Sequence, residues 1–195
     1  MTPRIGPLRD RIAALDGPRV LVALVGPPGS GKSTLADGLA EHLDAAVLPM
    51  DGFHLDNRLL QPRGLLPRKG APETFDINGL SRILQALRRG EDVVHPIFDR
   101  SREIAIAGAG IIHAATRIVL VEGNWLLLDA PGWRDLGPWD LTVHLDVPED
   151  TLRTRLEARW AHLPEAERRA KIDGNDLPNA RYVRDASRAA DIVFS

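Results

Sequence analysis

Apolar side chains form short continuous runs in some parts of the chain and recur every three or four positions in others. Residues 20–25, 118–121 and 141–145 are continuous apolar runs, as expected for strands buried on both faces. Residues 45–50 and 192–194 predict two further strands. Helical spacing occurs at Leu8, Ile12 and Leu15, at Leu35, Leu39 and Leu43, at Leu80, Ile83, Leu84 and Leu87, and across residues 151–160.

Strands that alternate with helices in this way predict an α/β fold with a mostly parallel sheet covered on both faces. Residues 93–98 also look like a strand, and residues 103–107 alternate as a half-exposed strand does. The three prolines in residues 55–75 predict that this stretch is mostly loop. In parallel α/β sheets ligands bind beyond the carboxyl ends of the strands, so the residues that follow each strand are the candidates for chemistry.

Composition narrows the class of protein. The chain has 195 residues, 44% of them hydrophobic, which suits a single compact domain over residues 1–195. The absence of cysteine excludes disulfides and thiolate chemistry. A formal net charge of −2 argues against a nucleic-acid partner. No apolar run approaches the roughly 18 residues of a membrane span, and the first 17 residues lack a signal-peptide core, so we expect a cytoplasmic protein.

A phosphate-binding loop follows the first strand. Gly26, Gly31, Lys32 and Ser33 fit the pattern G-x-x-x-x-G-K-[ST], between a buried strand and an amphipathic helix. Glycines let backbone amides turn toward an anion, and the next helix adds its dipole and free N–H groups. We therefore expect ATP to be bound by Gly26, Gly29, Ser30, Gly31, Lys32, Ser33 and Thr34, with Lys32 at the β- and γ-phosphates and the Ser33 hydroxyl on Mg²⁺.

Further motifs carry a resemblance to a family. Residues 50–54 read Met-Asp-Gly-Phe-His, residues 68–76 read Arg-Lys-Gly-Ala-Pro-Glu-Thr-Phe-Asp and residues 96–99 read Pro-Ile-Phe-Asp. With Asn-Asp-Leu-Pro-Asn at 175–179 and Ser-Arg-Ala-Ala at 187–190, they resemble the superfamily of uridine kinase, phosphoribulokinase and bacterial pantothenate kinase, and its fructokinase-like branch. Phe75 and Phe98 stand where the family pattern has tyrosine, which leaves the acceptor open.

The resemblance implies a three-layer P-loop NTPase fold with a small helical lid at about residues 155–178, and it implies that Asp51 is a catalytic base. The competing interpretation of Asp51 is a turn-forming residue before Gly52. Glu122 follows a buried strand, so we expect it to hold Mg²⁺ directly or through water; its alternative is a carboxylate that caps a helix.

The same resemblance suggests the substrate side and the lid. It places His54, Lys69, Phe98, Asp99 and Arg100 around the acceptor, together with Asp51. Arg155 and Arg159 lie one helical turn apart and would reach the phosphates from the lid, Arg159 at the transferred group; the alternative is a solvated helix face. Asn179 and Arg188 are expected near the adenine.

These patterns lead to one functional hypothesis and two alternatives. We expect an ATP-dependent kinase that moves the γ-phosphoryl group to a hydroxyl of a small molecule, such as a sugar, a nucleoside or pantothenate, with a slight preference for a sugar-like polyol. A nucleotide-binding regulatory ATPase is one alternative. A nucleotide kinase is the other, because Arg58, Arg63 and Arg68 could bind a phosphate acceptor. The absence of an Asn-Lys-x-Asp element excludes a guanine-specific GTPase.

Overall fold

Five parallel strands form the centre of the molecule. The computed structural model describes residues 5–195, and its main sheet has the strand order β2-β5-β1-β6-β7. The strands are β1 (Val20–Val25), β2 (Ala46–Pro49), β5 (Ile118–Gly123), β6 (Leu141–Leu145) and β7 (Ile192–Phe194). All five were predicted; β5 continues two residues beyond the apolar run, so that Glu122 lies inside the strand.

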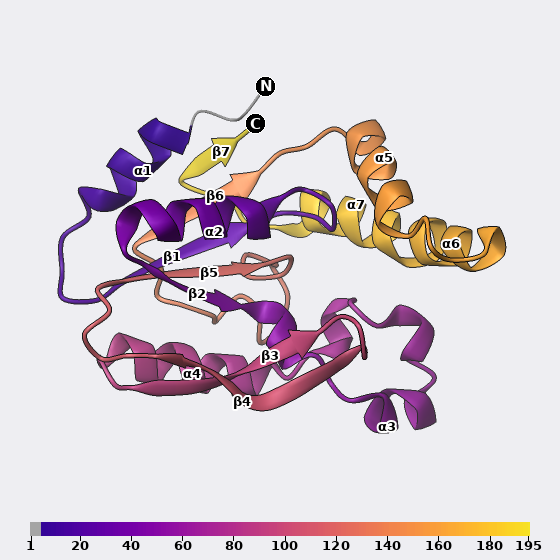
Figure 1. Ribbon diagram of the computed structural model, residues 1–195, viewed down its shortest axis with the longest axis horizontal. Coiled ribbons are helices and arrows are strands. Elements are labelled where there is room, and N and C mark those ends of the chain that lie inside the picture. The colour runs from indigo at the N-terminus through magenta and orange to yellow at the C-terminus, as the bar shows by residue number, and fades with distance from the viewer. Residues whose placement is uncertain (1–4) are drawn as a thin grey trace.

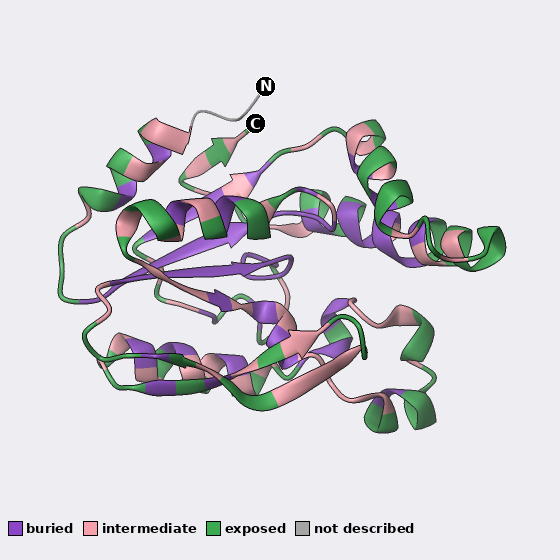
Figure 2. Ribbon diagram, in the orientation of Figure 1, coloured by how far each residue is buried: buried purple, intermediate pink, exposed green. Residues whose placement is uncertain are grey.

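Helices cover the two faces of this sheet (Figure 1). Alternate side chains of β1 point to opposite faces: Val22 and Leu24 pack against α1 (Ile5–Ala13) and α2 (Lys32–Leu43). Leu21 and Ala23 pack on the side of α4 (Ile77–Arg88) and α7 (Leu177–Ala186). All six residues of β1 and of β5 are buried, as the continuous apolar runs predict (Figure 2). The result is the three-layer α/β fold that the sequence predicts.

The remaining two strands form a separate hairpin. β3 (Val93–Asp99) pairs antiparallel with β4 (Ile104–Ile112), with an irregular register between His95 and Ile97. The prediction of one mostly parallel sheet therefore does not extend to these strands, and β4 is longer than the predicted residues 103–107. Their half-exposed side chains explain the difference, because a strand with one solvated face cannot enter a sheet that helices cover on both sides.

Residues 55–75 contain several short helical turns connected by loop, in fair agreement with the prediction. They are α3 (Asn57–Leu60), η2 (Gln61–Arg63), η3 (Leu66–Arg68) and η4 (Pro72–Thr74). Each of the three 3₁₀ turns has a proline in its first two positions, where the missing N–H costs no hydrogen bond.

A helical segment lies at the end of the molecule where the parallel strands have their carboxyl ends (Figure 1). It consists of α5 (Glu149–Arg159), α6 (Glu165–Lys171) and a π-helical turn, η5 (Ile172–Asp176), which continues into α7. Leu156, Ile172 and Leu177 form its own small apolar cluster. Within residues 5–195 no helix is long and apolar enough to cross a membrane.

Strand register decides which residues meet at the carboxyl edge of the sheet. Glu122 of β5 stands opposite Leu24 of β1 and opposite Pro49 of β2. The phosphate loop begins just after β1, and the 3₁₀ turn η1 (Met50–Phe53) begins directly after β2. Residues 26–34, Asp51 and Glu122 are therefore brought to one place although they are far apart in sequence.

Gly52 is required for the close approach of η1 to the hairpin. A Cβ atom on Gly52 would lie 2.3 Å from the carbonyl oxygen of Pro96. We predict that Gly52→Ala lowers the free energy of unfolding by about 1–3 kcal/mol, because the backbone around Asp51 or the hairpin must move. Gly38→Ala, inside α2 with its nearest atom at 3.7 Å, is the control and should raise stability by about 0.5–1 kcal/mol. Denaturant unfolding measures both; equal stability of the two variants would contradict this account.

Candidate active site

One cavity opens at the carboxyl edge of the sheet, between the phosphate loop, the hairpin, residues 55–75 and the helical segment α5–α7. Its walls contain eight residues that the sequence proposed for the site: Lys32, Asp51, His54, Lys69, Phe98, Arg100, Arg159 and Asn179. Six polar or aromatic residues join them that the sequence did not suggest: Glu103, Asn124, Trp160, Lys171, Asn175 and Asp176.

The phosphate loop is shaped by its glycines. Gly29 and Gly31 have φ angles of 79° and 92°, in the left-handed region that favours glycine. A Cβ on Gly26 would lie 2.7 Å from the Ser30 hydroxyl and 3.1 Å from the Cβ of Leu145, so a larger residue would not fit there. Gly31 is the N-cap of α2, and Lys32, Ser33 and Thr34 form the first turn of that helix. Anion-binding backbone groups and the Lys32 ammonium therefore belong to one rigid turn.

Glu122 is the acid closest to the start of α2. Its side chain is buried, and burial raises its pKa, while the Lys32 ammonium and a hydrogen bond from the Ser33 hydroxyl act in the opposite direction. Ser33 and Glu122 thus present two hard oxygen ligands side by side, the kind that Mg²⁺ prefers. Within residues 5–195 no cluster of three or more His, Asp or Glu side chains could hold a metal alone, so a bound Mg²⁺ would need further oxygens from nucleotide or water.

Asp51 lies beside the phosphate loop and forms an ion pair with Arg100 at the tip of the hairpin. Burial acts to raise the pKa of Asp51, but the nearby charges of His54, Arg100 and Lys32 outweigh it and hold that pKa below its usual value. The carboxylate is therefore ionised near neutral pH. Arg100 itself is half exposed, with 54% of its side chain accessible, so a ligand that enters the cavity can reach it.

His54 is clamped between two aromatic rings. Its ring centroid lies 4.1 Å from that of Phe75 and 4.5 Å from that of Phe98, and its Nδ1 is 2.7 Å from the carbonyl oxygen of Asp51. Burial lowers the pKa of His54, although the charge of Asp51 opposes this effect. An imidazole held at a fixed angle is suited to hydrogen bonding with a ligand hydroxyl.

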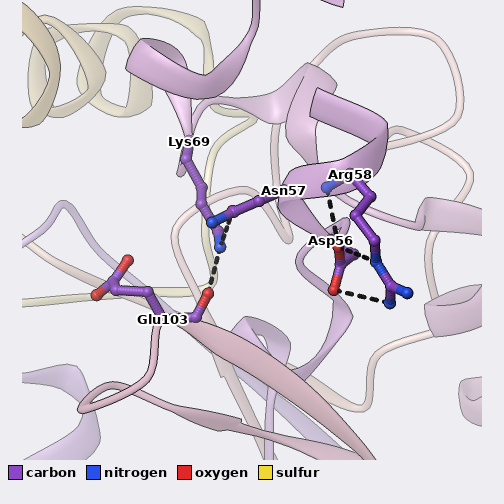
Figure 3. A network of polar contacts seen from close by, with 5 residues as sticks. All are labelled: Asp56, Asn57, Arg58, Lys69 and Glu103. Atoms are coloured by element: carbon purple, nitrogen blue, oxygen red, sulfur yellow. Dashed lines mark hydrogen bonds and ion pairs between the residues drawn. The ribbon is translucent and has the colours of Figure 1, made fainter. Parts of the chain in front are cut away.

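Lys69 is held by polar groups from two separate segments (Figure 3). Its Nζ donates to the side-chain oxygen of Asn57 at 2.7 Å and to the backbone carbonyl of Glu103 at 2.5 Å. The ammonium also lies 5.3 Å from the centroid of the Phe98 ring. Burial lowers the pKa of Lys69. These contacts connect residues 55–75 to the hairpin and keep the ammonium in the cavity wall.

The helical segment supplies the opposite wall. Arg159 and Lys171 both lie over the ring of Trp160, with 5.2 Å and 5.1 Å between charge and ring centroid. The Trp160 Nε1 donates to Asp176 at 2.8 Å, and burial raises the pKa of this aspartate although the hydrogen bond opposes the shift. Asn179 donates to Asn175 at 3.2 Å.

Outside the phosphate loop and Glu122, three proposed site residues do not line the cavity. Asp99 accepts hydrogen bonds from Ser101 and Arg102, which hold its pKa far below its usual range, so its carboxylate stabilises the hairpin turn. Arg155 donates to the carbonyl oxygens of Gly29 and Ser30 at 3.2 and 2.9 Å and supports the phosphate loop from outside.

Arg188 is the third. Its backbone N–H donates to the carbonyl oxygen of Leu127, which fixes the end of α7 against the chain after β5. Asn179 does line a cavity, but together with Asn175, Lys69 and the other acceptor-side residues that the sequence proposed. The expected placement of Asn179 and Arg188 at the adenine therefore has no support in this arrangement.

Comparison with known proteins agrees with this geometry. Residues 22–175 match the model of a family described as "AAA domain". The chain is 38% identical to the uncharacterized protein YggC of Escherichia coli, with 96% of this chain and 84% of YggC covered. A Schizosaccharomyces pombe protein named "Putative uridine kinase" is 31% identical, over 90% of this chain and 83% of its own length.

A crystal structure of a "putative fructose transport system kinase" from Silicibacter sp. TM1040 superimposes with a TM-score of 0.90 at 50% identity, covering 98% of this chain and 97% of that one. The chain belongs to the P-loop kinases related to uridine kinase and pantothenate kinase. The family resemblance read from the sequence is thereby confirmed. ATP is the nucleotide named for relatives of this family.

The Asp51–Arg100 pair can be tested by titration. We predict that Arg100→Gln raises the pKa of Asp51, because the substitution removes a positive charge and leaves the effect of burial. Carbon-13 NMR of aspartate-labelled protein measures the shift, with the Asp51 signal assigned by its loss in Asp51→Asn. Arg102→Gln is the matched control: it removes a charge from the same hairpin turn, but its partner is Asp99. An Asp51 signal that titrates identically in Arg100→Gln and in wild type would contradict the predicted effect of Arg100 on the pKa of Asp51.

Proposed function

We propose that this P-loop kinase transfers the γ-phosphoryl group of ATP to a hydroxyl group of a small molecule. One observation carries the proposal: an ionised carboxylate, Asp51, lies in the same cavity as the phosphate-loop ammonium of Lys32. A hydroxyl acceptor needs a group that takes its proton, whereas a phosphate acceptor does not. Asp51 supplies this group where the end of a nucleotide held by residues 26–34 would project.

The phosphate loop would hold the triphosphate through its backbone amides and through Lys32, whose charge offsets that of the β- and γ-phosphates. Ser33 and Glu122 would hold Mg²⁺. When bound, this ion neutralises negative charge on the phosphate oxygens. Burial raises the pKa of Glu122, whereas positive charge from Lys32 or from a bound cation favours its ionised form.

Asp51 would accept the proton of the acceptor hydroxyl while the oxygen of that hydroxyl bonds to phosphorus and the bond to ADP breaks. Before this step the hydroxyl has to replace Arg100 as a partner of the carboxylate. The exposed position of Arg100 makes that exchange possible, and the freed guanidinium can then contact the acceptor. His54 beside Asp51 would orient the acceptor through its fixed ring.

Residues 155–178 would act as a lid. Arg159 enters the cavity from the end of α5, so its guanidinium would approach the transferred phosphoryl group from the side opposite Asp51. The π-helical turn η5 within this segment is consistent with such a role, because π turns occur often at functional sites.

The nucleotide-kinase alternative loses its main support. Arg58, Arg63 and Arg68 are absent from the cavity wall. Arg58 pairs with Asp56 and Arg68 with Glu73 instead. A purely regulatory ATPase would have no use for a carboxylate partnered by a displaceable arginine next to Lys32. The names of relatives mention uridine and fructose, so they favour a hydroxyl-bearing acceptor without choosing one.

The base assignment predicts a selective loss. Asp51→Asn should lower phosphoryl transfer by about 10²–10⁴-fold, because general-base catalysis contributes on that order. ATP affinity should stay within a few-fold of wild type, since Asp51 is not part of the phosphate loop. Coupled ADP-release assays and calorimetry with a non-hydrolysable ATP analogue measure the two effects. Loss of nucleotide binding in this variant would assign Asp51 to the metal site instead.

The phosphate-loop assignment predicts the opposite pattern. Lys32→Ala should abolish ATP turnover and weaken nucleotide binding strongly, because the loop loses its only side-chain cation for the triphosphate, while circular dichroism shows an intact fold. Screening sugars, nucleosides and pantothenate for stimulated ADP release identifies the acceptor. Wild-type turnover in Lys32→Ala would refute the assignment.

A further inference from the structure

Lysine is almost absent from this chain, and its few copies meet in one place. Of the 25 basic residues, three are lysines and the other 22 are arginines. All three lysines, Lys32, Lys69 and Lys171, line the active-site cavity. Every other residue of this basic set is an arginine, and two of them, Arg100 and Arg159, share the cavity with the lysines. Lys32 belongs to the phosphate loop, and the other two lysines need a different explanation.

Lys69 has hydrogen-bond partners but no counter-ion. Both oxygens that it contacts, from Asn57 and from the Glu103 backbone, are neutral. Figure 3 shows the Glu103 carboxylate turned away from the ammonium and the Asp56 carboxylate bound to Arg58. An ammonium group has three N–H donors, so one remains for a ligand in the cavity. Among the residues that the structure describes, Lys69 takes part in no salt bridge.

The backbone at Lys69 is fixed as firmly as its side chain. Its carbonyl oxygen accepts a hydrogen bond from Asn175 of η5 at 2.8 Å. The next carbonyl, of Gly70, accepts from the buried Trp125 Nε1 at 2.9 Å. Gly70 itself has a φ of 104° and donates to Thr74 at 2.9 Å. Four segments of the chain therefore cooperate to place one cation, which is the arrangement of a preorganised binding group.

Lys171 approaches the same space from the lid side. It is the last residue of α6, its ammonium lies over Trp160, and within residues 5–195 it forms no salt bridge. Burial is the main cause that lowers the pKa of Lys69, the charges of Glu103 and Asp56 oppose it, and the positive charge of Lys171 acts in the same direction as burial, as expected of two like charges that repel one another. Asp176, another acid in the wall, already accepts a hydrogen bond from Trp160. An anion between the two lysines would relieve this repulsion.

We propose that Lys69 and Lys171 form an anion-binding subsite, and that the phosphoryl acceptor is a hydroxyl compound that also carries a carboxylate or phosphate group. This inference rests on the proposed function and names its substrate class. The anionic group would be held on the lysine side of the cavity, so that the hydroxyl reaches Asp51. The acceptor would also connect α6 to residues 55–75, since one lysine comes from each side, in addition to the contact that Asn175 of η5 already makes with Lys69.

Matched acceptor pairs that differ in one charged group test the proposal. D-glycerate is compared with glycerol, D-gluconate with D-glucitol, pantothenate with pantothenol, and D-fructose 6-phosphate with D-fructose. In ADP-release assays we expect at least one anionic member to be turned over at least tenfold more efficiently than its neutral partner. The first three pairs report on carboxylate and the fourth on phosphate, so the panel separates the two sources of charge.

Variants connect this preference to the lysines. Lys69→Met should raise KM for the anionic acceptor by about 10- to 100-fold, the effect of one charge-assisted hydrogen bond, and erase the preference over the neutral partner. Lys171→Met should act in the same direction. Arg68→Met and Arg169→Met are the controls, because each removes a charge from the same segment without lining the cavity. Turnover of a neutral acceptor at equal or higher efficiency would overturn the inference.

A binding measurement keeps the inference independent of turnover. In protein labelled only at lysine, three side chains give three carbon-13 Cε signals. With a non-hydrolysable ATP analogue filling the phosphate loop, inorganic phosphate or acetate should shift the signals of Lys69 and Lys171, whereas glycerol should not. Unmoved signals refute the anion subsite even if a kinase activity is found. Shifted signals with no stimulated ADP release from any pair refute the proposed kinase reaction and leave the subsite standing.

Discussion

The parallel pairing of β5 between β2 and β1 decides where every candidate functional group lies. Glu122 stands level with Leu24 on one side and Pro49 on the other, so the phosphate loop, Asp51 and Glu122 leave the sheet at the same height. Side chains alternate between the two faces of a strand, and a slip of one residue would turn Glu122 from the cavity side toward the other face. Both faces of β1 and β5 pack against apolar layers, so such a slip would place the Glu122 carboxylate in the layer that contains Val119 and Val121.

The central sheet was predictable because its signal is local. The apolar runs matched the bounds of β1, β6 and β7. A strand buried on both faces, such as β1, needs no partner residue to be recognised, whereas β7 is a short, partly exposed edge strand. The phosphate loop could be predicted equally well, because the positive φ angles of its backbone require glycine in any sequence that forms it. The hairpin was harder: its pattern showed two half-exposed strands but nothing about the sheet to which they belong.

The acceptor side could be predicted only in part, because it is assembled from irregular segments. Asp99 and Asp51 are both polar residues at the end of a predicted strand. The carboxylate of Asp99, however, accepts hydrogen bonds from Ser101 and Arg102, which follow it in the chain. Nothing in the sequence distinguishes the two aspartates before the hairpin is placed. The sequence did not single out Lys171, Asn175 and Asp176 as site residues. A polar helix near residue 170 resembles a solvated surface until its contact with residues 55–75 is known.

The two buried carboxylates at the sheet edge differ in what controls their charge. Asp51 has a lowered pKa because His54, Arg100 and Lys32 together outweigh burial, and of these Arg100 is the exposed partner that a ligand can displace. Glu122 has a raised pKa because of burial, opposed by Lys32 at the phosphate loop. An incoming acceptor that displaces Arg100 would change the charge around both carboxylates, because Asp51 and Arg100 also act on the pKa of Glu122. In the proposed reaction Asp51 would exchange a proton while Glu122 would stay beside the phosphates, and the different causes of their pKa shifts suit these two roles.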